Sequence, residues 1–189
     1  MATRRGRGGR ERIIAAATTL FETYGINAVG MERLAAQAPV SKRTLYAHFP
    51  TKEQLVVAYL DHLVHGGQTV ESALDRTDLS PRERILELFT VPGTGTAPIR
   101  GCPFVDAAVE FPDPDSTVHA FARHQKLRVG ERITQLLRDL GVEDPEELGE
   151  QLSILADGAA SRAMVLNDAS CVVRARAAAE TLLDAALPR

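Results

Sequence analysis

Residues 41–52, Ser-Lys-Arg-Thr-Leu-Tyr-Ala-His-Phe-Pro-Thr-Lys, decide how this sequence folds at its basic end. Ser41 and Thr51 are of the residue types that cap helix N-termini. Leu45 and Phe49 are four residues apart, so they lie on one face of a short helix. The stretch therefore predicts one short helix after Ser41 and the start of another after Thr51.

The residues just before this stretch complete a helix-turn-helix pattern. A short helix is expected over 31–38 and is broken at Pro39. Ala35 is small where the two helices must approach closely, and Val40 is apolar just after the turn. A helix-turn-helix places its second helix in the major groove of DNA. This part of the chain is therefore predicted to bind DNA.

The side chains of the second helix that point away from this core are candidates for DNA contacts. Base edges are expected to be read near the helix start, by Lys42, Arg43 and Ala47. Phosphates are expected to be bound by the flanking residues Thr44, Tyr46, His48 and Lys52. Thr51 joins Lys52 in a phosphate clamp, because the free N–H groups of a helix start favour an anion. Considered alone, Tyr46 could instead pack beside Leu45, and His48 could be a surface histidine.

The string Leu-Tyr-x-His-Phe at 45–49, followed by Lys52, resembles the signature of the TetR family of transcriptional repressors. The resemblance extends from the first helix to about Leu60. It implies that Lys42 and Arg43 read bases, that the flanking polar residues hold phosphates, and that the arginine-rich N-terminal arm reaches the DNA backbone. It also implies a homodimer on a palindromic operator, released by a small molecule.

Two positions depart from the family pattern. Gly30 stands where Thr is usual, which predicts the loss of one helix cap and one phosphate contact. Pro39 replaces the usual turn glycine. Because proline does not take positive φ, the turn is expected to close in another way.

Charge is distributed unevenly along the chain. The formal net charge is −3, yet residues 1–60 hold nine basic and four acidic side chains, against 13 and 21 in the remainder. A basic N-terminal part on an acidic body predicts that the first part meets a polyanion. The Arg/Gly run at 4–10 could equally be a solvated tail.

The rest of the sequence predicts helices throughout, beginning with an amphipathic helix over 10–24. Helix starts are expected at Ser80 (with Pro81 and Glu83), Ser116, Asp144 and Ser170. The helix after Ser80 is expected to end near residue 91. About nine helices and no strand predict an all-α fold. It comprises a helix-turn-helix DNA-binding domain with a basic arm (1–52) and a helical ligand-binding and dimerisation domain (53–189).

The last two helices carry narrow stripes that are rich in small residues. Two half-sites require two recognition helices about 34 Å apart, and hence a symmetric dimer. The predicted interface comprises Leu152, Leu155, Ala159, Ala163, Leu182 and Leu183. The alternative is that both stripes are buried within one monomer.

The middle helices combine apolar residues with a few polar groups, as ligand pockets do. With the resemblance, this predicts an apolar or amphipathic inducer bound among His62, Phe89, Phe104, Phe111, Phe121, His124 and Met164. The alternatives are core packing for each Phe and an exposed side chain for each His. No cofactor or metal is predicted. A redox role for Cys102 is not expected, because Asp106 and Glu110 oppose a lowered thiol pKa.

Several classes of protein are excluded or ranked lower. No stretch approaches the ~18 apolar residues of a membrane span, and neither G-x-S-x-G nor G-x-x-x-x-G-K-[ST] occurs. We expect a cytoplasmic regulator that is not an enzyme. A constitutive DNA-binding protein without an inducer remains an alternative, as does a protein that lies on a membrane through residues 4–21.

Overall fold

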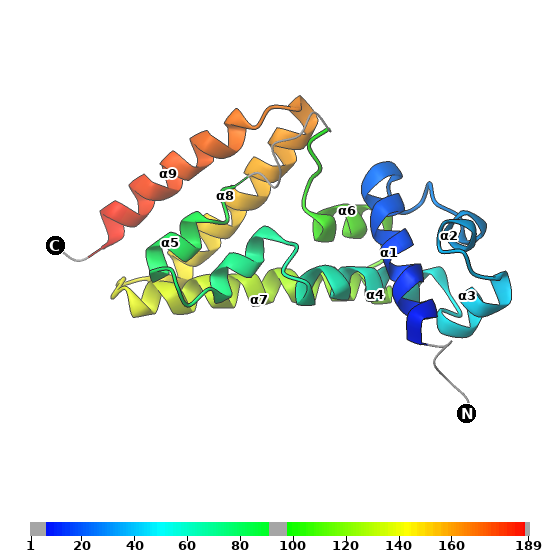
Figure 1. Cartoon of the computed structure of the whole chain (residues 1–189). Coiled ribbons are helices and arrows are strands. Elements are labelled where there is room, and N and C mark those ends of the chain that lie inside the picture. The colour runs from blue at the N-terminus through cyan, green and yellow to red at the C-terminus, as the bar shows by residue number, and fades with distance from the viewer. Residues whose placement is uncertain (1–6, 91–97, 188–189) are drawn as a thin grey trace. The chain divides into compact units, whose positions relative to one another are not determined.

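The computed structural model describes residues 7–90 and 98–187, and within them the chain is helical (Figure 1). The elements are α1 (Arg7–Tyr24), α2 (Met31–Gln37), α3 (Lys42–His48), α4 (Lys52–His65), the 3-10 helix η1 (Val70–Asp75), α5 (Pro81–Leu86), α6 (Pro103–Glu110), α7 (Thr117–Asp139), α8 (Pro145–Leu166) and α9 (Ser170–Ala186). No strand occurs in these ranges, which confirms the predicted all-α fold. No helix described here is both long and apolar enough to cross a bilayer.

Most of the predicted helix starts are confirmed by hydrogen bonds. A backbone N–H three residues further on donates to the side chain of Ser41, Thr51, Ser80, Ser116 and Asp144. Glu83 completes the capping box at Ser80. Each bond satisfies an N–H group that has no partner within its helix, which stabilises the helix by about 1 kcal/mol.

Two predicted helix limits are wrong. Ser170 is the first residue of α9 rather than its cap, and its N–H donates to Asp168 Oδ1 at 2.9 Å. The helix after Ser80 ends at Leu86, not near residue 91. The N–H groups of Leu88 and Phe89 bond to carbonyls three residues back. This tighter turn buries both side chains and ends the α-helix early.

The first compact unit comprises residues 7–66 and 104–123, which form α1–α4, α6 and the first turns of α7. Helix α1 packs against α2, α3 and α4. The rings of Phe21 and Tyr59 meet edge to face, with centroids 5.3 Å apart. This grouping extends beyond the predicted boundary at residue 52, and a functional division at that residue stays a prediction.

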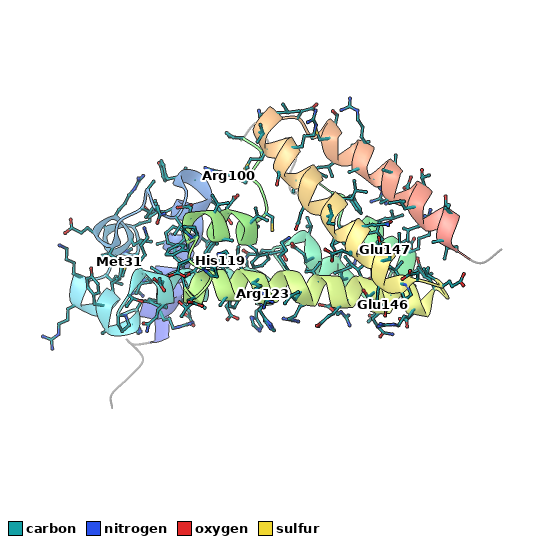
Figure 2. The ribbon with its side chains drawn as sticks, turned by 180° about the vertical axis from the view of Figure 1, so that it is seen from behind. Met31, Arg100, His119, Arg123, Glu146 and Glu147 are labelled. Carbon is teal, nitrogen blue, oxygen red and sulfur yellow. The ribbon has the colours of Figure 1, made fainter. Side chains whose placement is uncertain are left out.

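Residues 104–123 are joined to the first unit by polar contacts as well as by packing. Thr117 Oγ1 donates to Glu53 Oε2 at 3.0 Å, which ties α7 to α4. Between α6 and α7, His119 Nδ1 lies 2.9 Å from the carbonyl oxygen of Phe111 (Figure 2). The bond between Thr117 and Glu53 and the common compact unit place this segment with α1–α4, which helical periodicity alone does not reveal.

The second unit comprises residues 67–90, 98–103 and 124–187. Buried apolar side chains from η1, α5, α7, α8 and α9 form its core. Helix α9 packs against α8 and α5, and Arg176 Nη1 donates to the carbonyl oxygen of Leu86 at 2.7 Å. At the start of α8, Glu146 pairs with Arg138 of α7 (Figure 2). The acidic body thus has a core of its own.

This core contradicts four of the six residues of the predicted dimer stripe. Burial within the chain leaves no more than 8% exposed for Leu152, Ala159, Ala163 and Leu183. Leu155 and Leu182 pack half-buried against the same core. For the four buried residues the monomer alternative is correct, because α8 and α9 turn them inward, whereas a dimer contact of Leu155 and Leu182 stays a prediction. The large apolar side chains left exposed on the two helices are Ile154, Val165, Leu166 and Val173.

Helices α7 and α8 end in the same hydrogen-bonded turn. After α7, the N–H of Gly141 bonds to the carbonyl three residues back at 3.0 Å, and the N–H of Val142 to the carbonyl five residues back at 3.1 Å. After α8, Asn167 and Asp168 repeat the pair at 3.2 and 3.0 Å. Gly141 and Asn167 have φ of 77° and 48°. Both residue types suit this left-handed position.

The turn after α2 has the same form with a less suitable residue. The N–H of Val40 bonds to the carbonyl of Ala35 at 3.0 Å, which is the five-residue bond of that turn. Pro39 takes the left-handed position with φ of 21°, although its ring favours about −65°. It also has no N–H for the three-residue bond. The expectation that this turn avoids positive φ is wrong, since φ of Pro39 is positive and the Val40 bond closes the turn around it.

Candidate nucleic-acid interface

The inward face of α3 fixes the helix in the first unit. Leu45 and Phe49 are buried, as predicted, and so are Leu34 and Ala35 of α2. The guanidinium of Arg10 on α1 lies over the Phe49 ring, 5.5 Å from its centroid. These contacts determine which side chains α3 presents to solvent.

The outward face of α3 carries four of the predicted DNA ligands. They are all exposed: Lys42, Arg43, Tyr46 and Ala47. Tyr46 is 49% exposed, so its ring is not packed away beside Leu45. The structure thus gathers two cations, one phenol and one small apolar residue on a helix of seven residues.

Lys42 is already paired with an anion. Its Nζ donates to Glu32 Oε1 of α2, and both side chains are exposed. The hydrogen bond with Lys42 and its positive charge lower the pKa of Glu32, and the same contact raises the pKa of Lys42. Both groups are therefore charged at neutral pH, and a phosphate or a base contacted by Lys42 would compete with Glu32 for its ammonium.

Thr44 and His48 are half-buried, unlike their neighbours on α3. The hydroxyls of Thr44 and Ser41 lie 2.8 Å apart. A Cβ on Gly9 of α1 would stand only 3.0 Å from His48 Nε2, so the imidazole packs closely on that glycine. Any phosphate contact of these two residues depends on the part of each side chain that stays exposed.

Thr51 and Lys52 stand at the start of α4. Thr51 Oγ1 accepts the N–H of Gln54 at 3.2 Å, so this oxygen caps the helix. Lys52 is half-buried, and burial lowers the pKa of its ammonium while the charge of Glu110 acts in the opposite direction. The structure places the two predicted phosphate ligands side by side, next to a carboxylate that sequence reasoning did not connect with them.

Two further predicted features lie at the edge of this surface. Gly30 precedes α2 and provides no side-chain cap, as predicted, and a Cβ there would meet no atom within 4 Å. Arg4 and Arg5 of the predicted arm lie outside the described residues. Arg10 is exposed on α1.

Comparison with known proteins identifies this arrangement. A family model for "Bacterial regulatory proteins, tetR family" matches residues 13–59. The crystal structure of the tetr-transcriptional regulator sav143 from Streptomyces avermitilis is 31% identical, with a TM-score of 0.79 and coverage of 94% of this chain and 97% of that one. The chain belongs to the tetR family of bacterial regulatory proteins.

Two relatives extend this identification of the TetR-family chain. The HTH-type transcriptional regulator YjdC from Escherichia coli (strain K12) is 26% identical over 181 residues, which cover 92% of this chain and 93% of YjdC. The HTH-type transcriptional activator FasR from Mycolicibacterium smegmatis is 40% identical over 80 residues, covering 40% of this chain and 35% of FasR. The TetR-family chain is a DNA-binding transcriptional regulator, and its family is one of regulators rather than enzymes.

The residues predicted to bind a ligand in this TetR-family protein are divided between its two units. The first unit holds His62, Phe104, Phe111 and Phe121, and the second holds Phe89, His124 and Met164. Phe89 and Phe104 are 3% and 2% exposed, whereas both histidines are exposed. The seven residues form no single cluster within either unit, and their ligand-binding role stays a prediction.

A charged cluster of the second unit escaped sequence reasoning. Lys126 Nζ lies 2.6 Å from Asp157 Oδ1 and 3.6 Å from Glu71 Oε1, and Cys102 Sγ donates to Glu71 Oε1 at 3.8 Å. Burial by itself lowers the pKa of Lys126, but the attraction of its neighbours, including the carboxylates of Asp157 and Glu71, outweighs it and raises that pKa. These groups come from η1, α7, α8 and the residues before α6, so their spacing in the sequence does not predict the cluster.

Proposed function

We propose that this TetR-family regulator is a repressor that binds a palindromic operator as a homodimer through α3 and leaves it when a small molecule binds the second unit. The exposed face of α3 carries the proposal. Lys42 and Arg43 stand at the start of the helix, while Leu45 and Phe49 anchor its other side. This is the arrangement by which a recognition helix brings its first turns to base edges.

The proposed DNA contacts fall into two classes with different signatures. Lys42, Arg43 and Ala47 read bases, and phosphates are held by Thr44, Tyr46, His48, Thr51 and Lys52. Base contacts determine the sequence preference, whereas phosphate contacts determine the salt dependence. The two classes can therefore be separated by substitution.

Selection of random duplexes on the wild-type protein, followed by sequencing, tests DNA recognition. An enriched palindrome supports the proposal. Arg43→Ala should relax the base preference at a cost of about 1–3 kcal/mol, and Lys52→Ala should lower the salt slope by about one. Arg123→Ala removes an equal charge from the exposed face of α7 and serves as the control. Equal discrimination by wild type and Arg43→Ala contradicts base reading, and binding to anionic vesicles alone favours the membrane alternative.

The proposed dimer uses the exposed side of α8 and α9. Ile154, Gly158 and Val165 recur at intervals of four and seven on α8, and Val173 lies on α9. Val165 is 75% exposed and Val173 67% exposed, and a Cβ on Gly158 would meet nothing within 4 Å. An apolar face with room for close approach fits a second copy of these helices.

Two matched substitutions test this dimer face. Val165→Glu should shift the protein to monomer in sedimentation, because a symmetric contact would bury the charge twice. Val109→Glu on α6 is the control, since Val109 is 73% exposed and lies outside the proposed face. A dimeric Val165→Glu protein that still binds the selected duplex contradicts the assignment.

The proposed ligand is an apolar or amphipathic molecule. The partly buried Lys126 cluster is a better polar anchor than His62 or His124, because both histidines are exposed. By linkage, a compound that weakens DNA binding must bind more weakly in the presence of DNA, by the same factor.

Titration of candidate compounds with and without the selected duplex tests this release. An inducer should show two different affinities. Lys126→Met should change the affinity of a compound that uses this anchor. Equal affinities in the two states for every bound compound favour the alternative, a DNA-binding protein without an inducer.

A further inference from the structure

The turn between α1 and α2 is held by a side chain from a distant part of the chain. The N–H of Ile26 donates to Glu110 Oε1 at 2.8 Å, and the N–H of Asn27 donates to Glu110 Oε2. In return, Asn27 Nδ2 donates to the carbonyl oxygen of Glu110 at 3.1 Å. Glu110 is the last residue of α6, where a helical carbonyl has no partner within its helix. Three hydrogen bonds therefore join residues more than 80 positions apart.

The end of α1 leaves these N–H groups available. Gly25 has φ of 84°, and its N–H bonds to the carbonyl of Phe21 at 2.9 Å, which completes the local turn. The next two N–H groups point together at one carboxylate. A Cβ on Gly25 would stand 3.3 Å from Glu110 Oε1, so the carboxylate lies close against the backbone.

The same turn leads into the helix-turn-helix. Ile26 and Val29 are 4% and 0% exposed, and the N–H of Val29 bonds to the carbonyl of Ile26 at 3.2 Å. Two side chains of the turn are thus anchored in the core of the first unit just before Met31, where α2 begins. Without the carboxylate, the partly buried N–H of Ile26 loses its partner, which costs more than the loss of a fully exposed contact.

We propose that Glu110 is a positioning residue for DNA recognition, holding residues 25–27 so that α2 and α3 keep their orientation on α1. The proposal rests on DNA binding by α3. Glu110 contacts no DNA in this role, and it acts through the two turn N–H groups.

The charge of Glu110 and its hydrogen bonds act on DNA binding with opposite signs. Glu110 exerts an electrostatic effect on Lys52, a proposed phosphate ligand. If the carboxylate mattered only as a negative charge, its removal would strengthen DNA binding, because repulsion of the phosphates would fall. If it positions the turn, its removal weakens binding to the preferred sequence. One substitution distinguishes the two.

Glu110→Gln in the full-length protein is the test. The amide oxygen can accept one turn N–H, but the amide nitrogen faces the other, so one bond is lost. We expect the affinity for the selected duplex to fall about fivefold or more, the affinity for a scrambled duplex not to fall, and the salt slope to stay unchanged. Hydrogen exchange of residues 25–29 should become faster.

Two further variants complete the experiment. Asp115→Asn removes the same charge from an exposed residue of the same segment, and it should lower the affinity for neither the selected nor the scrambled duplex. Asn27→Ala keeps the carboxylate and removes only the bond from the exposed Asn27 side chain to the carbonyl of Glu110. It should lower the affinity for the selected duplex by a smaller factor than Glu110→Gln. This variant tests the proposal even if Glu110→Gln fails to fold.

Each outcome separates this inference from the proposed function. If wild type enriches a duplex and both Glu110→Gln and Asn27→Ala bind it as tightly as wild type or more tightly, the positioning role is overturned and DNA recognition stands. If wild type enriches no duplex, the proposed function fails and the inference fails with it.

Discussion

The helices of the two units end in different ways. In the second unit, α7 and α8 end at Gly141 and Asn167, each with both hydrogen bonds of the turn and a residue type suited to positive φ. In the first unit, α2 ends at Pro39, which lacks an N–H and is held at φ of 21°. After α1, the N–H groups of Ile26 and Asn27 donate to the carboxylate of Glu110, more than 80 positions away in the sequence.

This difference separates local from non-local control of a fold. The turns after α7 and α8 are closed by backbone bonds between residues close in the sequence. The helix ends beside the proposed DNA surface depend on a strained proline and on a carboxylate from α6. Strain and remote contacts of this kind are found where a surface has to adopt one particular orientation.

The largest effect is expected when Gly141, after α7 in the second unit, is replaced by the residue type that stands at Pro39 after α2 in the first unit. Gly141→Pro should lower the free energy of unfolding by at least about 3 kcal/mol, because proline loses the N–H bond and does not reach φ of 77° without strain. Denaturant titration measures the loss. Gly141→Asn is the control and should cost less than about 1 kcal/mol. A tolerated proline would show that this turn is not fixed by its φ.

The reverse exchange should stabilise the first unit. Pro39→Gly should raise the free energy of unfolding by about 1–2 kcal/mol, because glycine takes the positive φ and restores the missing N–H. Part of the gain is offset by the greater freedom of glycine in the unfolded chain. Pro81→Gly at the first turn of α5 has no such strain to relieve and should destabilise. A loss of stability in Pro39→Gly would contradict strain at this turn.

A pair of alanine substitutions should separate stability from DNA binding. Gly25→Ala and Gly141→Ala should each destabilise the protein by about 1 kcal/mol, because both positions have positive φ. Only Gly25→Ala should also weaken binding to the selected duplex, since its Cβ would crowd Glu110 Oε1. Unfolding and DNA titrations on both proteins check this. Equal DNA affinities would remove the distinction between the two helix ends.

The smallest effect is expected at the end of α8. Asn167→Gly should destabilise by about 0.5 kcal/mol, because easier access to positive φ offsets most of the loss of one hydrogen bond. That bond runs from the N–H of Ile99 to Asn167 Oδ1 at 3.0 Å. Thermal unfolding measures the loss of stability, with Asn167→Ala as the control. The alanine variant should lose more stability than the glycine variant. If Asn167→Gly lost more stability than Asn167→Ala, the bond to Ile99 could not explain the difference, because both variants lose that bond.

Local signals made most of the fold predictable. The caps at Ser41, Thr51, Ser80 and Asp144 were predicted because a cap needs only a side chain and an N–H three residues on. The prediction at Ser170 is wrong because Asp168 accepts the N–H of Ser170 itself, while the N–H of Val173, which a Ser170 cap would bind, bonds to the carbonyl of Ala169. Two nearby acceptors were possible here, and the capping pattern alone does not choose between them.

The candidate site was predictable only where its residues are neighbours in the sequence. The outward face of α3 follows from helical spacing around Leu45 and Phe49. By contrast, spacing did not reveal that Glu32 pairs with Lys42 or that Glu110 meets Asn27, because these contacts depend on how elements pack. The stripe at Leu152 was misread for the same reason, since an apolar face looks alike whether a partner or its own chain covers it.

The ion pair between Lys42 and Glu32 would make the proposed contact of Lys42 with DNA an exchange of partners. When Lys42 moves to a phosphate or a base, Glu32 is left exposed on α2 and attracts a cation from solution. Each phosphate neutralised by a protein normally releases condensed counterions into the bulk, which gives the entropic gain of binding. In this case the cation attracted by the unpaired Glu32 would offset part of the counterion release. In the proposed complex, Lys42 is therefore expected to add less to the counterion entropy of binding than a cation that has no carboxylate partner in the free protein.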